Sequence, residues 1–159
     1  MYRQSARQTR RLVLGLIASS AVLAATRPGA EPAMTITVWK DPSCGCCRGW
    51  VEHLRRNGFS VAVIDTTDVH AIKTERGVPA ALASCHTAEI GRYTVEGHVP
   101  AAAIRRLLAE SPEALGLAAP GMPIGSPGME GGTPEVYEVL LFGERPASVY
   151  GRFIGEHPA

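Results

Sequence analysis

The chain has 159 residues, of which 45% are hydrophobic and 19% are charged, and its formal net charge is +1. The length suits one modest domain with a limited core. The composition is that of a folded globular protein and excludes an intrinsically disordered one.

The first 25 residues resemble a secretory signal peptide in composition. Four arginines and no acidic residue precede "LVLGLIASSAVLAA", an apolar run of 14 residues that ends in small side chains. This order is typical of an export signal. A membrane-spanning helix needs about 20 apolar residues, so we expect cleavage near Ala25, or as late as Ala30, and no stable membrane span afterwards. An uncleaved anchor is the alternative.

Export would change both the charge and the surroundings of the thiols. Cleavage lowers the formal net charge from +1 to −3. A mildly acidic protein without a basic patch argues against nucleic acid as a partner. Outside the cytosol, thiols normally become disulfides unless a metal or a reductant holds them. The pair Arg10 and Arg11 is compatible with twin-arginine export as well as the general secretory route, so the route stays open.

The mature domain, taken as residues 34–155, begins with alternating strands and helices. The predicted elements are strands at Thr35–Trp39 and Phe59–Asp65 and helices at Gly45–Asn57 and Val69–Arg76. Gly58 and Gly77 are expected to end the two helices, and Asp68 to cap the second one. A strand, a helix and a strand in this order predict a parallel pair with a right-handed crossover.

The second half of the chain adds more strands, one helix and a long loop. The predicted elements are a strand at Ala88–Gly97 with a turn or bulge at Gly91, a helix at Ala101–Glu110 after Pro100, a loop at Gly116–Pro134, and a hairpin of Val136–Gly143 with Ala147–Phe153. Together the two halves predict an α/β domain in which helices flank a central mixed sheet and a β-hairpin closes the chain.

The loop at Gly116–Pro134 holds six glycines and four prolines in 19 residues. A structureless segment of this length is either a linker or a functional loop. We favour a functional loop, because only a hairpin follows it. It carries Met122 and Met129 in similar settings, "PGMP" and "PGME".

Four cysteines define the candidate site. Three lie within four positions in "SCGCC", as Cys44, Cys46 and Cys47, and Cys85 lies far downstream in "SCHT". Structural disulfides among the first three would close tiny loops, which stabilise weakly, and a bridge between the adjacent Cys46 and Cys47 would be strained. A purely structural role is therefore disfavoured.

A redox role is the second interpretation. Cys44 and Cys47 form a C-x-x-C between a strand and a helix, where unpaired N–H groups and the helix dipole lower the pKa of a thiol. The pattern looks like a thioredoxin-like site. However, Cys46 adds a third thiol able to scramble a disulfide, and "SCHT", Ser84 to Thr87, occupies the place where thioredoxin-like oxidoreductases carry a cis-proline.

A metal site is the third interpretation. If the fold is thioredoxin-like, Cys85 lies across from the other three cysteines. Four thiolates suit zinc, but zinc sites usually draw on two separated ligand pairs. Thiolates and thioethers select Cu(I), and bridging thiolates hold several copper ions. Met122 and Met129 are candidates for additional soft ligands or a cover, with simple packing as the alternative.

The five histidines divide by position. His86 adjoins Cys85 and can ligate or orient a cluster, and His98 in "VEGHVP" is either a further candidate or a structural turn residue. We expect no functional role for the other three, which are predicted on helix surfaces or in the tail: His53, His70 and His157.

The motifs "CGCC", "VPAALASCHTA", "VEGHVPAAAIRRLL" and "GMPIGSPGME" resemble those of the CopG-type periplasmic copper-resistance proteins, from about Val38 to Phe153. The resemblance implies a thioredoxin-like fold in the periplasm and a cysteine-bridged cluster of more than one copper ion, held as Cu(I). It also implies a role in interconverting Cu(I) and Cu(II) during copper or silver stress. At matching positions the implied ligands are Cys44, Cys46, Cys47 and Cys85.

We therefore interpret the sequence as an exported, single-domain, thioredoxin-like copper-binding protein. One alternative is a periplasmic thiol–disulfide oxidoreductase that uses Cys44 and Cys47. Another is a passive Cu(I) metallochaperone that docks a periplasmic copper donor or acceptor. The sequence does not separate the chaperone from a redox catalyst, because both need soft, exchangeable ligands.

Overall fold

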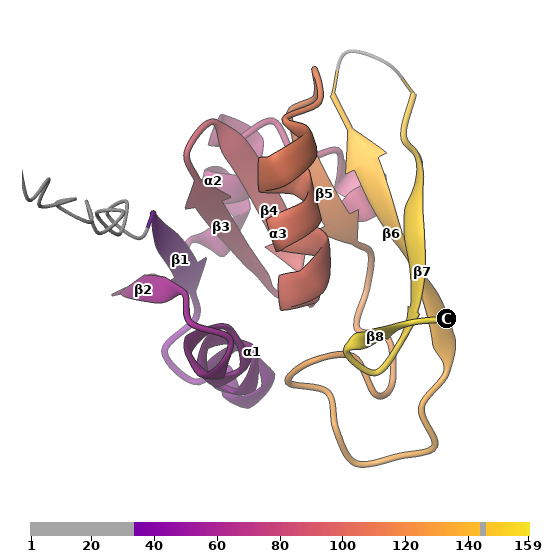
Figure 1. Cartoon of the computed structure of the whole chain (residues 1–159). Coiled ribbons are helices and arrows are strands. Elements are labelled where there is room, and N and C mark those ends of the chain that lie inside the picture. Colours follow the sequence, from indigo (N-terminus) through magenta and orange to yellow (C-terminus); the bar gives the residue numbers. More distant parts are fainter. Residues whose placement is uncertain (1–33, 144–145) are drawn as a thin grey trace, which may run out of the picture. The chain divides into compact units, whose positions relative to one another are not determined.

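A computed structural model of the chain describes residues 34–143 and 146–159. The predicted signal peptide, residues 1–25, lies outside the described residues. In chain order the elements are β1 (Thr35–Lys40), α1 (Gly45–Arg56), β2 (Ser60–Asp65), α2 (Val69–Glu75), the 3-10 helix η1 (Ala80–Leu82), β3 (His86–Ile90), β4 (Tyr93–Gly97), α3 (Ala101–Glu110), β5 (Gly116–Ala119), β6 (Val136–Phe142), β7 (Ser148–Ile154) and β8 (His157–Pro158) (Figure 1).

The strands of the described residues form an eight-stranded sheet in the order β2-β1-β3-β4-β5-β6-β7-β8. β1 is parallel to β2 and β4 is parallel to β5, whereas the other neighbours are antiparallel. The predicted α/β class, central mixed sheet and C-terminal hairpin of β6 and β7 are confirmed. The thioredoxin-like description of this sheet stays a prediction.

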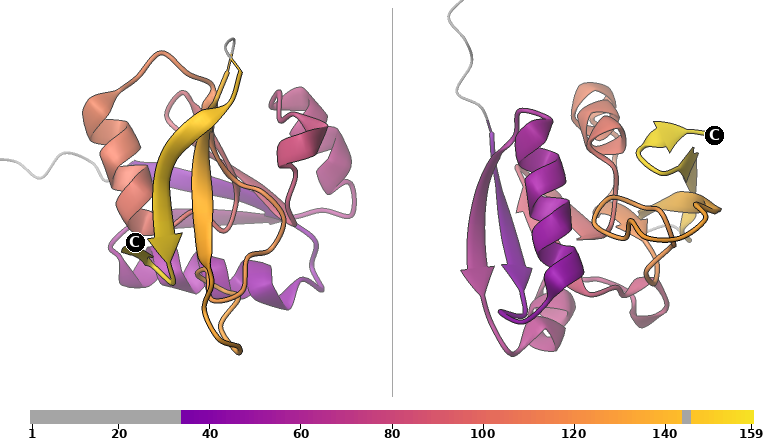
Figure 2. Two further views of the ribbon diagram at one scale, coloured as in Figure 1. Left: turned by 90° about the vertical axis from the view of Figure 1, so that its right-hand side faces the viewer. Right: turned by 90° about the horizontal axis from the view of Figure 1, so that it is seen from below.

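The helices divide between the two faces of the sheet (Figure 2). α1 and α3 share one hydrophobic core, where Trp50 and Leu54 meet Ile104 and Leu107, and each of these four side chains is fully buried. α2 packs on the opposite face. Its Lys73 hydrogen-bonds to Thr87 and Glu96, and each of these is adjacent in sequence to a strand residue that faces the core. Successive strand residues point to opposite faces.

The register of β1 and β3 determines which loops meet. Lys40, the last residue of β1, pairs with His86, the first residue of β3. The chain therefore leaves β1 at the same end of the sheet where it enters β3. This pairing brings the segment that follows β1 close to the segment that precedes β3, and both segments contain cysteines.

The structure differs from the sequence-based elements at three places. The turn expected at Gly91 separates two antiparallel strands, β3 and β4, and Gly91 has a φ of 58°, which favours glycine. The first four residues of the predicted loop form β5, which is fully buried between β4 and β6 and so lacks the alternation of a half-exposed strand. His157 pairs with Ile154 in β8, although a tail was expected there.

None of the helices in the described part of the chain has the length and hydropathy of a membrane-spanning segment.

The loop after β5 returns to α1 and contacts it backbone to backbone. A Cβ atom on Gly49 of α1 would lie 2.8 Å from Cα of Gly128. A Cβ on Gly128, whose φ is 88°, would lie 2.7 Å from the backbone nitrogen of Trp50. Side chains at either position would separate the loop from the helix, so this contact requires both glycines.

We expect Gly49→Ala to lower the free energy of unfolding of the metal-free protein by about 1–3 kcal/mol, the usual effect of overpacking. Gly45→Ala is the matched control on the same helix, because its Cβ would meet only the end of the Arg48 side chain at 3.9 Å. Gly45→Ala should leave stability unchanged or raise it by up to about 1 kcal/mol. Urea unfolding measures both, and equal effects of the two substitutions would contradict the backbone contact.

Candidate metal centre

A tight turn delivers three cysteines to the start of α1. The Cys44 N–H donates to the Asp41 carbonyl at 3.1 Å, and the Ser43 N–H donates to the Asp41 carboxylate at 2.8 Å. Hydrogen bonds from Ser43 lower the pKa of Asp41. Cys44 is the N-cap residue of α1, and its Sγ accepts the Cys47 N–H at 3.2 Å. The cysteine thus takes the place of the usual oxygen-bearing cap.

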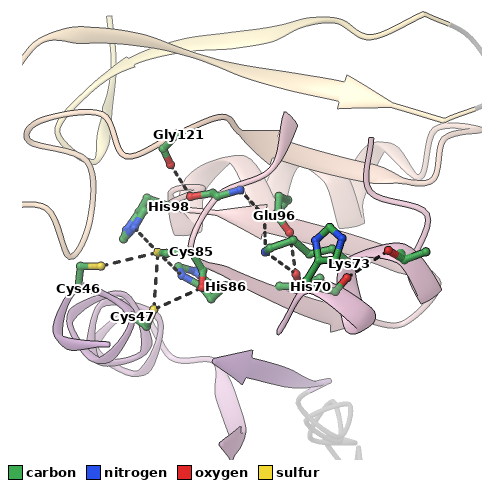
Figure 3. Close-up of polar contacts among 12 residues, drawn as sticks. Cys46, Cys47, His70, Lys73, Cys85, His86, Glu96, His98 and Gly121 are labelled. Carbon is green, nitrogen blue, oxygen red and sulfur yellow. Dashed lines mark hydrogen bonds and ion pairs between the residues drawn. The ribbon is translucent and has the colours of Figure 1, made fainter. Parts of the chain in front are cut away.

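The four sulfur atoms gather in one place, and Figure 3 shows those of Cys46, Cys47 and Cys85. Cys46 Sγ lies 3.5 Å from Cys44 Sγ and 3.7 Å from Cys85 Sγ, and Cys85 Sγ lies 3.6 Å from Cys47 Sγ. All four are within 4.8 Å of one another. We call the Sγ atoms of Cys44, Cys46, Cys47 and Cys85 the sulfur cluster. The structure thus brings together the four cysteines that the sequence singled out, and their role as ligands stays a prediction.

Two of the four cysteines are oxidised in this structure. Cys44 and Cys47 form a disulfide, whereas Cys46 and Cys85 are free thiols. The bridged pair is the C-x-x-C on which the redox interpretation of the sequence depends. A four-thiolate site therefore requires that this disulfide first accept two electrons.

His98 points its Nε2 at the sulfur cluster. Nε2 lies 3.1 Å from Cys85 Sγ, and Nδ1 lies 2.7 Å from the Pro127 carbonyl oxygen. A carbonyl only accepts, so Nδ1 carries the proton and Nε2 keeps its lone pair. A histidine whose second nitrogen donates to a backbone carbonyl is the usual arrangement of a metal ligand.

His86 lies on the other side of Cys85. Its Nδ1 is 3.3 Å from Cys85 Sγ, and its fully buried ring packs against Trp50 and His98 at centroid distances of 4.4 Å and 5.0 Å. Trp50 is itself fixed, because its indole N–H donates to the Val99 carbonyl at 2.8 Å. His86 Nε2 is buried without a hydrogen-bond partner among the described residues. Such an unpaired polar atom is uncommon in a protein interior.

Burial sets the protonation states of the site. Burial first, and then the neighbouring Cys46, raise the pKa of the Cys85 thiol to about 12. Burial also lowers the pKa of His98, and it holds the pKa of His86 well below its usual value, helped by His98 and Lys73. Both imidazoles are therefore neutral near pH 7 and can offer lone pairs.

The donor set fits a soft metal ion. Cys85 belongs both to the sulfur cluster and to a second group with His86 and His98, so sulfur and imidazole donors are contiguous. Thiolates prefer Cu(I), and imidazole also suits copper. His86 Nδ1, 3.3 Å from Cys85 Sγ, and the Nε2 lone pair of His98 are the nitrogens that face a metal bound here.

The two methionines of the loop lie in different surroundings. Met122 has an exposed fraction of 54%. Met129 is half-buried in a turn, where its N–H donates to the Ser126 carbonyl at 2.8 Å and its carbonyl accepts the Gly125 N–H at 2.9 Å. Their role as weak ligands or as a cover stays a prediction.

The structure corrects the expectation for His53. The sequence placed this residue on the surface of α1, but it is 2% exposed. Its Nε2 accepts the Ala101 N–H at the start of α3 at 3.0 Å, and its Nδ1 faces Glu156 at 3.0 Å. Position 53 lies three residues after Trp50, so the helical period already placed it beside the apolar stripe. His70 is exposed, as expected.

Sequence reasoning also missed a charged pair behind Cys85. Glu96 of β4 is fully buried and forms an ion pair with Lys73 of α2 at 2.6 Å. Glu96 stands in the motif "VEGHVP", where the sequence analysis singled out only His98, and Lys73, 23 positions away, stands in none. A glutamate in "YTVEG", a strand whose other residues read as buried, was the available signal.

The fold and the site together define a small α/β protein with a cysteine- and histidine-rich centre suited to a soft metal. Two solved structures, described as "Copper resistance protein copG", form 2 and form 1, are similar to this chain. Both are 44% identical to it and cover 77% of it, and the chain covers 99% and 98% of theirs, with TM-scores of 0.73 and 0.71.

The chain therefore belongs to the CopG family of copper resistance proteins. A family model described as "Protein of unknown function, DUF411" matches residues 82–129, a range that includes Cys85, His86, His98 and most of the loop. No curated protein matches the chain.

The high pKa of Cys85 predicts slow alkylation. In the metal-free Cys46→Ser protein with the Cys44–Cys47 disulfide intact, Cys85 is the remaining free thiol. Burial is the largest cause of the raised pKa of Cys85 and persists in this variant, so the thiol is protonated at pH 8. We expect iodoacetamide to label it on the order of a hundredfold more slowly than free cysteine, with a rate that rises beyond pH 10.

Mass spectrometry of the time course measures this rate. The same variant in urea is the control and should react like free cysteine. Rapid labelling of the folded protein at pH 8 would contradict the burial of this thiol.

Proposed function

We propose that this protein binds more than one copper ion as Cu(I) in its reduced sulfur cluster and acts in copper resistance. Copper is the cargo or substrate of the site. The observation that supports the proposal most directly is that all four sulfurs lie within 4.8 Å of one another. Four thiolates at this spacing repel one another unless cations lie between them. Bridging by soft Cu(I) ions satisfies that requirement, and silver(I) shares the same chemistry.

Two histidines complete the proposed site. The Nε2 lone pair of His98 and Nδ1 of His86 supply nitrogen donors on the side of Cys85. Met122 and Met129 would add weak thioether contacts or cover the cluster from the loop. A structural zinc ion fits less well, because it needs one tetrahedral set of four ligands and leaves the histidines without a role.

The disulfide supports a redox component of this function. The thiolates of Cys44 and Cys47 can each give one electron to a Cu(II) ion, which yields two Cu(I) ions and the Cys44–Cys47 disulfide. A dithiol reductant, which is itself oxidised to a disulfide, returns the pair to thiolates. The protein would thereby convert Cu(II) to Cu(I), the reducing direction of the expected interconversion, and its capacity for Cu(I) would depend on the state of this pair.

A thiol–disulfide oxidoreductase is the second candidate function. The Cys44–Cys47 disulfide at a helix N-terminus favours it. Two neighbours of the disulfide count against it. Cys46 Sγ lies 3.5 Å from Cys44 Sγ, and a third thiol beside the bridge is able to scramble it. The His98 nitrogen aimed at Cys85 has no role in exchange through Cys44 and Cys47.

We further propose that the protein is exported to the periplasm and exchanges copper with a donor or acceptor protein there. Cys44, Cys46 and Cys85 are each partly exposed, so a partner thiolate or thioether can reach the cluster. A passive metallochaperone would exchange Cu(I) without forming the disulfide. The redox state of Cys44 and Cys47 after copper transfer distinguishes the two cases.

Anaerobic copper loading tests the principal proposal. We expect the fully reduced protein to bind more than one Cu(I) per chain, and the form with the Cys44–Cys47 disulfide to bind less. Metal analysis after gel filtration, with a parallel thiol titration, measures both quantities. Binding of one zinc ion per chain with copper excluded would contradict the proposal.

Cysteine substitutions separate the two candidate functions. Because a bridging thiolate lost from either side opens the cluster, Cys85→Ser should reduce the copper content about as much as Cys46→Ser. An oxidoreductase predicts a different pattern, in which Cys44 and Cys47 are essential and Cys46 and Cys85 are dispensable. Copper loading and a disulfide-reductase assay on the four single variants decide between these patterns, with the melting temperature of each metal-free variant as the control for folding.

A further inference from the structure

A buried carboxylate lies directly behind Cys85. Glu96 is fully buried, and a carboxylate in the protein interior needs hydrogen-bond partners for both oxygens. Its Oε1 accepts the Lys73 ammonium and the Ser84 backbone N–H, each at 2.6 Å, and its Oε2 accepts the Thr87 hydroxyl at 2.7 Å. Lys73 also donates to the Thr87 hydroxyl oxygen at 3.0 Å. Lys73, Glu96 and Thr87 form a closed ring of hydrogen bonds, which the Ser84 N–H joins through Glu96, and Figure 3 labels Lys73 and Glu96.

This network fixes the backbone on both sides of Cys85 and His86. Ser84 immediately precedes Cys85, and Thr87 immediately follows His86. Cys85 lies before the start of β3, so sheet pairing does not hold the Ser84 N–H, and a side chain from β4 takes that place. Ser84 also donates its hydroxyl to the Gly121 carbonyl in the loop.

Glycine at position 97 strengthens this constraint. A Cβ on Gly97 would lie 2.5 Å from Cβ of Ser84 and 2.7 Å from the Ala119 carbonyl oxygen. The backbone of β4 thus packs against Ser84 at Gly97. The preceding residue, Glu96, accepts the Ser84 N–H. Ser84 is held from two directions, and the Cα of Cys85 is held with it.

Stability alone does not explain a buried lysine–glutamate pair. Lys73 is 8% exposed and Glu96 is fully buried, so both charges lose most of their hydration. Replacing such pairs with apolar residues of similar size is often neutral or stabilising. An apolar pair at these positions would fill the space, but it would leave the Ser84 N–H without an acceptor.

We propose that Glu96 is the positioning residue for Cys85: its carboxylate binds the Ser84 N–H and thereby holds Cys85 Sγ within reach of Cys46, Cys47 and His98. Lys73 and Thr87 in turn hold the carboxylate. The use of this geometry for copper rests on the function proposed above. The hydrogen bond itself and its effect on Cys85 do not depend on copper.

Two double variants isolate the hydrogen bond from the ion pair. Lys73→Met/Glu96→Gln removes both charges, but the amide oxygen still accepts the Ser84 N–H and the amide nitrogen donates to the Thr87 hydroxyl. Lys73→Met/Glu96→Leu also removes both charges and leaves the Ser84 N–H without an acceptor. The two proteins differ in the side-chain amide, which supplies the acceptor for the Ser84 N–H and a donor for the Thr87 hydroxyl.

Two measurements compare these variants. In the metal-free protein with the Cys44–Cys47 disulfide, the alkylation rate of Cys85 relative to that of Cys46 should rise several-fold in the leucine variant and stay near wild type in the glutamine variant. In the reduced protein, Cu(I) affinity should fall about tenfold in the leucine variant and remain near wild type in the glutamine variant, as for loss of an outer-shell partner.

Ile90→Val is the control for general destabilisation, because Ile90 is fully buried in β3 away from this network. It should lower the melting temperature without changing either measurement. Equal behaviour of the leucine and glutamine variants in the alkylation assay would overturn the positioning role. A wild-type protein that binds no Cu(I) would refute the proposed function, and the alkylation assay would still decide the positioning role.

Amide hydrogen exchange in the wild-type protein provides a test that needs no variant. The Ser84 amide should exchange as slowly as the core amides of β3, because its acceptor is a buried carboxylate. Exchange at the rate of an exposed loop amide would overturn the proposal.

Discussion

The antiparallel pairing of β1 with β3 is the constraint on which the metal centre depends. Lys40 ends β1 opposite His86, which begins β3. The chain therefore leaves the sheet toward Cys44 at the place where it arrives from Cys85. A tight turn at Asp41 and one turn of helix then suffice to bring all four sulfurs within 4.8 Å of one another. A shift of this register by one residue would turn the donors of β3 to the opposite face.

The alternation of side chains along β3 separates the metal donors from the buried charges. His86 points toward Trp50 on the face covered by α1, and Thr87 points toward Lys73 on the face covered by α2. On the first face, burial keeps the imidazoles neutral, so their lone pairs remain available to a soft cation. On the second face, a lysine and a glutamate compensate each other and hold the backbone from behind. The first face thus keeps the His86 imidazole available as a donor, and the second face fixes the backbone that carries it.

The loop after β5 contacts every segment that carries a candidate ligand. Gly121 donates its N–H to the Ala83 carbonyl, two residues before Cys85. The Pro127 carbonyl sets the tautomer of His98, and Gly128 lies against the first turns of α1. A displacement of this loop would therefore release the orientation of His98 and the packing of the cysteine-bearing helix together. The glycines and prolines of the loop therefore serve these contacts and do not only make the loop flexible.

The sequence by itself determined the features that depend on neighbouring residues. Caps and apolar periodicity within one segment placed α1 and α3 correctly, and adjacency alone crowds Cys46 against Cys47. Only the tertiary structure decided the features that join distant segments. It buried His53 against the Ala101 N–H, and it bound the carboxylate of Glu96 to the amide that precedes Cys85. The physical reason is that every residue except proline has the same backbone N–H, so residue types carry no sign of which amide a buried side chain will meet.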